Sequence, residues 1–184
     1  GEVTPVFVYT NYPTAELFIN GKSYGKQSKN NSSLKSRYRL MWMDAVYEPG
    51  EVKVVAYNKD GKAVAEKTVR TAGKPHHIEL TADRDRLKAD GKDLSFINVR
   101  VVDKNGNLCP DDTRQIQFKV RGAGAYRAAA NGNSASLELF HLPEMKLFSG
   151  QLTAIVQTAE EPGTIYFEAS APGVKGATLE LISK

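Results

Sequence analysis

The sequence predicts an all-β protein made of two tandem β-sandwiches, with almost no helix. Three observations lead to this fold class. Apolar and polar residues alternate over short runs, which is the period of half-buried strands. Asn-Gly or Asp-Gly steps separate several runs, at Asn20-Gly21, Asp60-Gly61 and Asn105-Gly106. No long window keeps a helical apolar stripe free of Gly and Pro.

The three Gly steps are typical of hairpin tips. A two-residue turn with φ > 0 at both central residues matches the twist of its flanking strands, and Asn, Asp and Gly tolerate that conformation best. Turn chemistry alone explains these residues, so we expect plain turns and not loops that grip a ligand.

The first predicted unit covers residues 1–73 and is the smaller sandwich. The segment Gly73-Lys74-Pro75 ends it, because Gly is permissive and Pro cannot donate to a strand ladder. A break this short predicts a semi-rigid connection. The expected strands of this unit are residues 6–10, 15–20, 37–43, 51–58 and 62–70.

The second predicted unit covers residues 74–184. Seven or so short strands with turns at this spacing are typical of an immunoglobulin-like sandwich. The first unit is predicted to be a smaller sandwich of the same kind. The expected strands of the second unit are residues 76–82, 94–103, 114–120, 125–129, 151–158, 163–170 and 174–182.

Composition excludes several classes of protein. An apolar content of 41% is ordinary for a globular chain, and no apolar run approaches the roughly 18 residues of a membrane span. The single cysteine, Cys109, cannot form an internal disulfide and is expected to be a buried apolar residue. Gly1 opens directly onto polar sequence without a signal peptide, so we expect a piece of something longer.

Positive charge is concentrated near the N-terminus. Residues 1–73 hold 11 Lys and Arg against 7 Asp and Glu, whereas residues 74–184 hold 14 of each. No helix-turn-helix, zinc finger or aromatic RNA-binding signature accompanies these bases, so we expect no nucleic-acid partner. Basic residues on exposed strands also discourage edge-to-edge association. Residues 17–43 hold six bases and no acid: Lys22, Lys26, Lys29, Lys35, Arg37 and Arg39.

We find no pattern that predicts catalysis, a cofactor or a metal site. His76 and His77 are adjacent, and adjacent strand residues point to opposite faces, so they are not expected to chelate one metal. The segment 103–114 has Leu108 at the sixth position, where a calcium loop has Gly, and Arg114 at the twelfth, where it has Glu. The carboxylates of 83–93 lie beside their own bases and are expected to form solvated turns.

Aromatic residues are the candidates for contact with sugar or with another domain. Tyr38, Leu40 and Trp42 share one face of the strand expected at 37–43. A face that carries Leu beside the only Trp is typical of a core, so we expect Trp42 and Leu40 to be buried; sugar stacking is the alternative. The candidate contact residues are Trp42, Tyr38, Phe140 and His141.

The segment 131–149 is too apolar for a solvated linker and too long for a simple turn. It is either a flap over its own sandwich or a docking surface for the first unit or a further domain. Pro143 argues against one uninterrupted strand, and a short helical turn is an option at 143–148.

Several stretches together resemble a known family. The runs "VFVYTNYPTAELFINGKSYGK" and "YRLMWMDAVYEPGEVKVVAYNKDGKAVAEKTVRTAGKP" are similar to the sandwich domain that follows the catalytic barrel in many bacterial β-galactosidases of glycoside hydrolase family 2. The run "IELTADRDRLKADGKDLSFINVRVVDKNGNLCPDDTRQIQFKVRGAGAY" resembles that family's last domain, which is similar to invasin-type bacterial immunoglobulin-like domains.

The resemblance implies a non-catalytic C-terminal fragment of a β-galactosidase-like enzyme that supports a catalytic barrel outside this sequence. It implies no catalytic residue here, since the family's catalytic glutamates lie in the barrel. The expected partner is the catalytic domain of the parent chain, together with oligo- or polysaccharide. A carbohydrate-binding module and an adhesin-like repeat are the alternatives. The expected location is extracytoplasmic, in the periplasm or at the surface of a bacterium.

Overall fold

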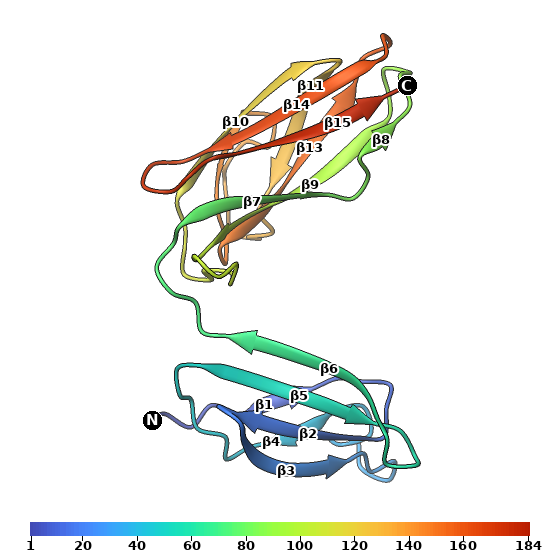
Figure 1. The fold of residues 1–184 in the computed structure, drawn as a ribbon, viewed down its shortest axis with the longest axis vertical. Helices are drawn as coiled ribbons and strands as arrows, with labels where there is room; N and C mark the ends of the chain where they lie inside the picture. Colours follow the sequence, from blue (N-terminus) through green and yellow to red (C-terminus); the bar gives the residue numbers. More distant parts are fainter. The chain divides into compact units, whose positions relative to one another are not determined.

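The computed structural model describes residues 1–184, which form two compact units, Gly1–Thr71 and Ala72–Lys184 (Figure 1). All fifteen secondary-structure elements are β-strands, which confirms the predicted all-β class of immunoglobulin-like sandwiches. No segment forms a helix that is long and apolar enough to cross a membrane.

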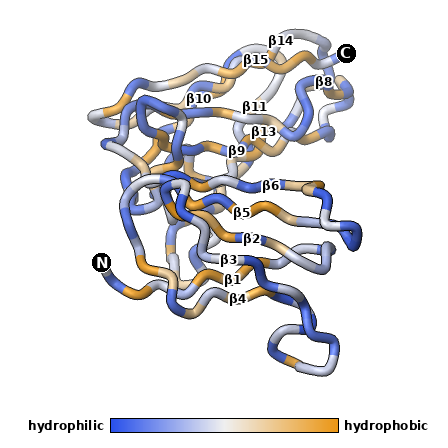
Figure 2. Tube along the Cα trace, turned by 60° about the horizontal axis from the view of Figure 1, so that its bottom comes forward, coloured by the Kyte–Doolittle hydropathy of each residue, from blue (hydrophilic) through white to orange (hydrophobic).

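Unit 1 contains two sheets. A four-stranded antiparallel sheet has the order β3-β2-β5-β6, and a two-stranded sheet pairs β1 with β4. The long loop between β3 and β4 is largely hydrophilic along its length (Figure 2). The strands are β1 (Val6–Val8), β2 (Thr14–Ile19), β3 (Lys22–Ser28), β4 (Leu40–Trp42), β5 (Glu51–Tyr57) and β6 (Ala63–Arg70).

The core of unit 1 lies between its two sheets. Along β2, buried and half-buried residues alternate as period 2 requires, so Ala15, Leu17 and Ile19 all face inward. Leu40 and Trp42 of β4 enter from the other side, and Trp42 is 1% exposed. The predicted burial of both residues is therefore confirmed.

The sequence-based prediction for residues 37–43 is wrong at its N-terminal half. Only Leu40–Trp42 forms a strand, and residues before it form turns. Tyr38 therefore does not share the inner face with Leu40 and Trp42. Its side chain is 67% exposed, because no partner strand extends the two-stranded sheet as far as Tyr38.

Two of the three Gly steps lie at hairpin tips, as predicted: Asn20-Gly21 joins the paired strands β2 and β3, and Asp60-Gly61 joins β5 and β6. The prediction is wrong for Asn105-Gly106, which lies in a turn after β9 closed by an isolated bridge between Val102 and Leu108, since the next strand, β10, belongs to the other sheet. Asn20 and Gly21 both have positive φ, 49° and 81°, whereas at the other two steps only the glycine does, with φ of 76° at Gly61 and 80° at Gly106. These two turns are longer, since their closing backbone hydrogen bonds join Asn58 to Lys62 and Asp103 to Asn107.

Unit 2 is a sandwich of a five-stranded and a four-stranded sheet, with orders β12-β10-β14-β15-β8 and β11-β13-β9-β7. All pairings are antiparallel except that of β15 with β8. Its strands are β7 (His77–Ala82), β8 (Arg86–Leu87), β9 (Leu94–Val102), β10 (Gln115–Gly122), β11 (Gly124–Ala130), β12 (Glu144–Lys146), β13 (Gln151–Thr158), β14 (Gly163–Ser170) and β15 (Ala177–Ser183).

The core of unit 2 gathers the inward residues of both sheets, including Ile97 and Val99 of β9 and Ile165 and Phe167 of β14. Cys109 is buried among them, as predicted, and burial raises the pKa of its thiol. The helical turn considered for 143–148 is wrong. Residues Glu144–Lys146 form β12, which pairs with β10 and buries Met145.

Asp103 is the most heavily bonded carboxylate of unit 2. Its oxygens accept hydrogen bonds from the backbone nitrogens of Gly73 (2.8 Å), Asn105 (2.8 Å) and Asn107 (2.9 Å), and from Asn107 Nδ2 (3.0 Å). These bonds, that from Gly73 first, hold the pKa of Asp103 well below its ordinary value. The carboxylate thereby fastens both the 103–107 turn and the first residues of the unit.

This lowered pKa predicts a pH dependence of stability. A carboxyl group with a depressed pKa in the folded state stabilises the fold fully at pH values above its unfolded pKa. This stabilisation is lost progressively as pH falls from the unfolded pKa through the folded pKa. We expect unit 2 to lose melting temperature as pH falls from about 5 to about 3, and Asp103→Asn to flatten this loss. Thermal melts of both proteins across that range measure the effect. An unchanged slope in Asp103→Asn would contradict it.

Candidate functional site

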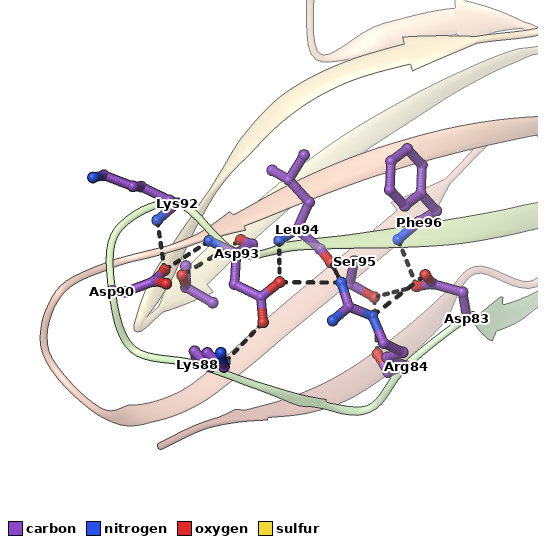
Figure 3. A network of polar contacts seen from close by, with 10 residues as sticks. Asp83, Arg84, Lys88, Asp90, Lys92, Asp93, Leu94, Ser95 and Phe96 are labelled. Atoms are coloured by element: carbon purple, nitrogen blue, oxygen red, sulfur yellow. Dashed lines mark hydrogen bonds and ion pairs between the residues drawn. The ribbon is translucent and has the colours of Figure 1, made fainter.

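A network of polar contacts connects residues within the segment 83–96 of unit 2 (Figure 3). Asp83 Oδ1 accepts hydrogen bonds from Phe96 N (2.8 Å) and Ser95 Oγ (3.2 Å). Asp93 accepts from Lys88 N (2.9 Å), Leu94 N (3.0 Å) and Arg84 Nη2 (3.1 Å). The cluster therefore consists of turn-forming bonds, as the sequence predicted for 83–93.

The electrostatics of this cluster do not suit acid catalysis. The bond from Lys88 N lowers the pKa of Asp93 most strongly, and burial opposes it. Burial likewise opposes the ionisation of Asp83, but the bonds from Phe96 N and Ser95 Oγ lower its pKa overall. A general acid needs a raised pKa, so these carboxylates do not suit that role, and their hydrogen bonds fasten turns.

The two adjacent histidines lie differently from the prediction. His77 opens β7 and His76 precedes it, so strand alternation does not separate their rings. The Nδ1 atoms are 3.0 Å apart and the rings meet edge to face. No group of three His, Cys, Asp or Glu side chains is arranged to hold a metal ion. The pair is therefore a local contact between two rings.

The first candidate contact surface is in unit 2, on the segment before β12. We call Leu137, Leu139, Phe140 and Leu142 the apolar loop surface. Its side chains point into solvent, with Leu137 95% exposed and Phe140 60% exposed. His141 lies between Phe140 and Leu142 and is exposed too. Along the segment these four apolar side chains alternate with Glu138 and His141, and their own sandwich leaves all four exposed.

The backbone under this surface is firmly held. Tyr126 Oη donates hydrogen bonds to Leu142 O (2.6 Å) and Phe140 O (3.1 Å), and Ala129 N donates to Phe140 O (2.8 Å). Burial raises the pKa of Tyr126 to about 12, so it keeps its donor proton. Phe118 N donates to Pro143 O (2.8 Å).

The structure divides the segment 131–149 into a covered and an uncovered part, and docking of the uncovered part stays a prediction. Met145 and Leu147 are buried in their own sandwich, as a flap would be. The apolar loop surface is not covered by its own sandwich, as a docking surface would not be.

The second candidate contact surface is a pocket of about 410 Å³ in unit 1. Its lining residues come from the segment after β1, from the end of β3 and from the turns before β4. We call it the tyrosine pocket, because two large rings dominate it: Tyr9 is 68% exposed and Tyr38 is 67% exposed. The lining residues are Tyr9, Thr10, Asn11, Lys29 and Tyr38.

The structure thus separates the four predicted contact residues. Trp42 lies in the core of unit 1, where its Nε1 donates to Gly25 O (3.0 Å), so its ring face is not available to a sugar. Tyr38 lines the tyrosine pocket. Phe140 and His141 belong to the exposed segment of unit 2. The sequence analysis did not identify Tyr9 as a contact residue, because nothing in its strand-like run distinguishes an exposed Tyr from a buried one.

Comparison with known proteins gives these units a family. Residues 78–180 match the family described as glycoside hydrolase family 2 C-terminal domain 5, and residues 1–65 match a domain of unknown function, DUF4982.

Two relatives and one solved structure match this chain over nearly its whole length. The beta-galactosidase BoGH2A of Bacteroides ovatus is 42% identical over 94% of the chain and 20% of its own length. A beta-glucuronidase of Formosa agariphila is 26% identical over 100% of the chain and 18% of its own length. The crystal structure of a glycosyl hydrolase family 2 member from Bacteroides cellulosilyticus has a TM-score of 0.86 and 32% identity, over 98% of this chain and 23% of that one.

The chain spans about a fifth of the length of the curated relatives it matches. The family match covers more than half of the chain. It agrees with the resemblance found in the sequence and favours it over an adhesin-like repeat. The chain therefore belongs to glycoside hydrolase family 2, as a non-catalytic C-terminal part of such a protein.

Proposed function

We propose that this chain supports the catalytic domain of its parent glycoside hydrolase by docking through the apolar loop surface. One observation carries the proposal: apolar side chains are held outward on a backbone that is itself well bonded. Exposed contiguous apolar side chains usually mark an interaction site. The relatives supply the partner, since about four-fifths of their length lies outside the match.

The hydrogen bonds beneath the surface favour docking. Because Tyr126 and Ala129 already fix the backbone at Phe140, little conformational entropy remains to be lost on contact. Covering Leu137, Leu139 and Phe140 removes apolar area from water, and each fully buried side chain of this size contributes about 1.5–3 kcal/mol. The surface is therefore suited to a stable contact within one polypeptide.

Substitution in the full-length parent tests this proposal. Leu139→Ser combined with Phe140→Ser is expected to leave the melting temperature of the 184-residue chain unchanged, because both side chains are exposed there. The same double variant is expected to lower the melting temperature of the parent by several degrees. Phe96→Ser, which removes an exposed apolar ring elsewhere in unit 2, is the control. An equally stable parent would contradict docking.

A second candidate function is saccharide binding, favoured by the tyrosine pocket. Tyr9 and Tyr38 offer exposed ring faces beside the polar side chains of Thr10 and Asn11. Tyr combines an apolar ring with a hydroxyl that can hydrogen-bond, which suits the mixed surface of a sugar. The pocket would hold a glycan near the catalytic domain.

The proposed support role also predicts the activity of the isolated chain. We expect it to hydrolyse no aryl galactoside, because its clustered carboxylates are engaged by backbone donors. A chromogenic assay on the purified chain measures this. Turnover above background that disappears on substitution of one Glu would contradict the proposal.

The location of the parent is a further part of the proposal. We place it outside the bacterial cytoplasm, where polymeric glycans are encountered. Fractionation of the native host, with detection of the parent in the periplasm or at the surface, tests this placement; recovery in the cytoplasm alone would contradict it.

A further inference from the structure

We propose that the tyrosine pocket of unit 1 binds an acidic saccharide, one that carries carboxylate or sulfate groups. The inference rests on the second candidate function, saccharide binding, and names its ligand class. It draws on two features that meet around Tyr38: the exposed aromatic rings of the pocket, and two positive charges without an acidic partner, Lys29 in the lining and Arg37 beside the Tyr38 ring.

The rings provide the stacking surface. Tyr9 follows β1, Tyr38 precedes β4, and both line the same pocket. Both rings are about two-thirds exposed, whereas Trp42 is buried. A volume of about 410 Å³ is within the range of small-molecule sites, which is about 300–1,000 Å³. A sugar residue can therefore pack against either ring.

The charges provide the selectivity. Lys29 lines the pocket and donates one hydrogen bond to Thr10 O, which leaves further N–H donors on its ammonium group. Arg37 is not a lining residue, but its guanidinium carbon is 5.8 Å from the centre of the Tyr38 ring, and its Nε donates to Asn31 O (3.0 Å). Its terminal nitrogens have no hydrogen-bonded protein partner. These groups match the oxygens of a carboxylate or sulfate.

No acidic side chain neutralises these bases. Neither Lys29 nor Arg37 has a carboxylate oxygen within 4 Å, whereas Lys26 and Arg70 of the same unit are paired with Glu16 and Glu51. The sequence around the pocket has the same bias, since residues 17–43 contain no acid. An uncompensated positive pocket attracts an anionic ligand and gains little from a neutral one.

Binding measurements with two matched probes test the proposal. Calorimetry on the 184-residue chain would compare an oligogalacturonate with a neutral galacto-oligosaccharide of the same length. We expect affinity for the acidic probe to exceed that for the neutral probe by about tenfold or more. We also expect it to fall steeply when NaCl is raised from about 50 to about 500 mM.

Variants assign the site. Tyr38→Ala and Arg37→Gln are each expected to lower the affinity for the acidic probe by about tenfold or more. Lys22→Gln removes the same charge from the exposed edge strand β3, where Lys22 lies near the Tyr24 ring and not near a lining residue, and is expected to leave binding unchanged. Equal losses in Arg37→Gln and Lys22→Gln would overturn the site in favour of general charge attraction.

The remaining outcomes distinguish failure of the acidic selectivity from failure of saccharide binding itself. Equal affinity for both probes would overturn the acidic selectivity and leave saccharide binding standing. Binding of neither probe would overturn both. Binding of poly-glutamate as tightly as the oligogalacturonate would also overturn the inference, because the pocket would then recognise an acidic protein surface and not a saccharide.

Discussion

Replacing Trp42 with alanine is expected to lower the free energy of unfolding of unit 1 by about 3–5 kcal/mol. Trp42 is the largest fully buried side chain and packs with Leu17 and Leu40 between the two sheets. The substitution leaves a cavity that the two-stranded sheet, only three residues long on each strand, cannot close. Its Nε1 hydrogen bond to Gly25 O is lost as well. Chemical denaturation monitored by circular dichroism measures the change.

Two further variants separate the contributions at Trp42. Trp42→Phe keeps a buried ring but removes the bond to Gly25 O, so a smaller loss is expected. Tyr38→Ala removes an exposed ring from the same segment and is expected to change stability by less than about 0.5 kcal/mol. If Trp42→Ala left unfolding unchanged and instead abolished oligosaccharide binding, the packing described for unit 1 would be wrong.

The second large effect is expected at Gly122, the last residue of β10. Gly122 has a φ of 88° and lies opposite Ile165 of β14. A Cβ at this position would overlap the carbonyl oxygen of Thr164 and lie 3.6 Å from Ile165 Cα. This contact is with backbone, so no side-chain rotation relieves it, and β14 also carries Ile165 and Phe167 into the core.

Gly106→Ala is the matched control for Gly122→Ala. Gly106 has a similar φ of 80°, but no atom lies within 4 Å of a Cβ placed there. The control therefore measures the left-handed backbone alone, which costs about 1–2 kcal/mol for a residue with a Cβ. We expect Gly122→Ala to lower the free energy of unfolding of unit 2 by a clearly larger amount. Equal losses in the two variants would show that β14 moves aside without cost.

Most strands were predictable because their inner and outer faces differ. In β2, β9 and β14 the alternation of apolar and polar residues matches the alternation of burial. β3 was not predicted, because it is an edge strand with little burial on either face and its residues are mostly polar. Lys22 and Lys26 on it discourage pairing with another chain.

The contact surfaces were predictable only in part. The apolar character of 131–149 is visible in the sequence, but which of its residues turn inward depends on the pairing of β12 with β10. That long-range pairing buries Met145 and leaves Phe140 outside. Similarly, the strand pattern put Tyr38 on the inner face, whereas the actual sheet ends at Leu40. Tyr9 and Tyr38 are far apart in the sequence, and only the fold brings them together in one pocket.

Docking requires that the catalytic part of the parent protein covers the apolar loop surface. Amide hydrogen exchange of residues 137–142, compared between the 184-residue chain and the full-length parent, tests it most directly. If the surface is covered, this segment exchanges more slowly in the parent than in the 184-residue chain, whereas exchange in the core strand β9 is unchanged. Equal exchange of residues 137–142 in the two proteins would contradict the docking role.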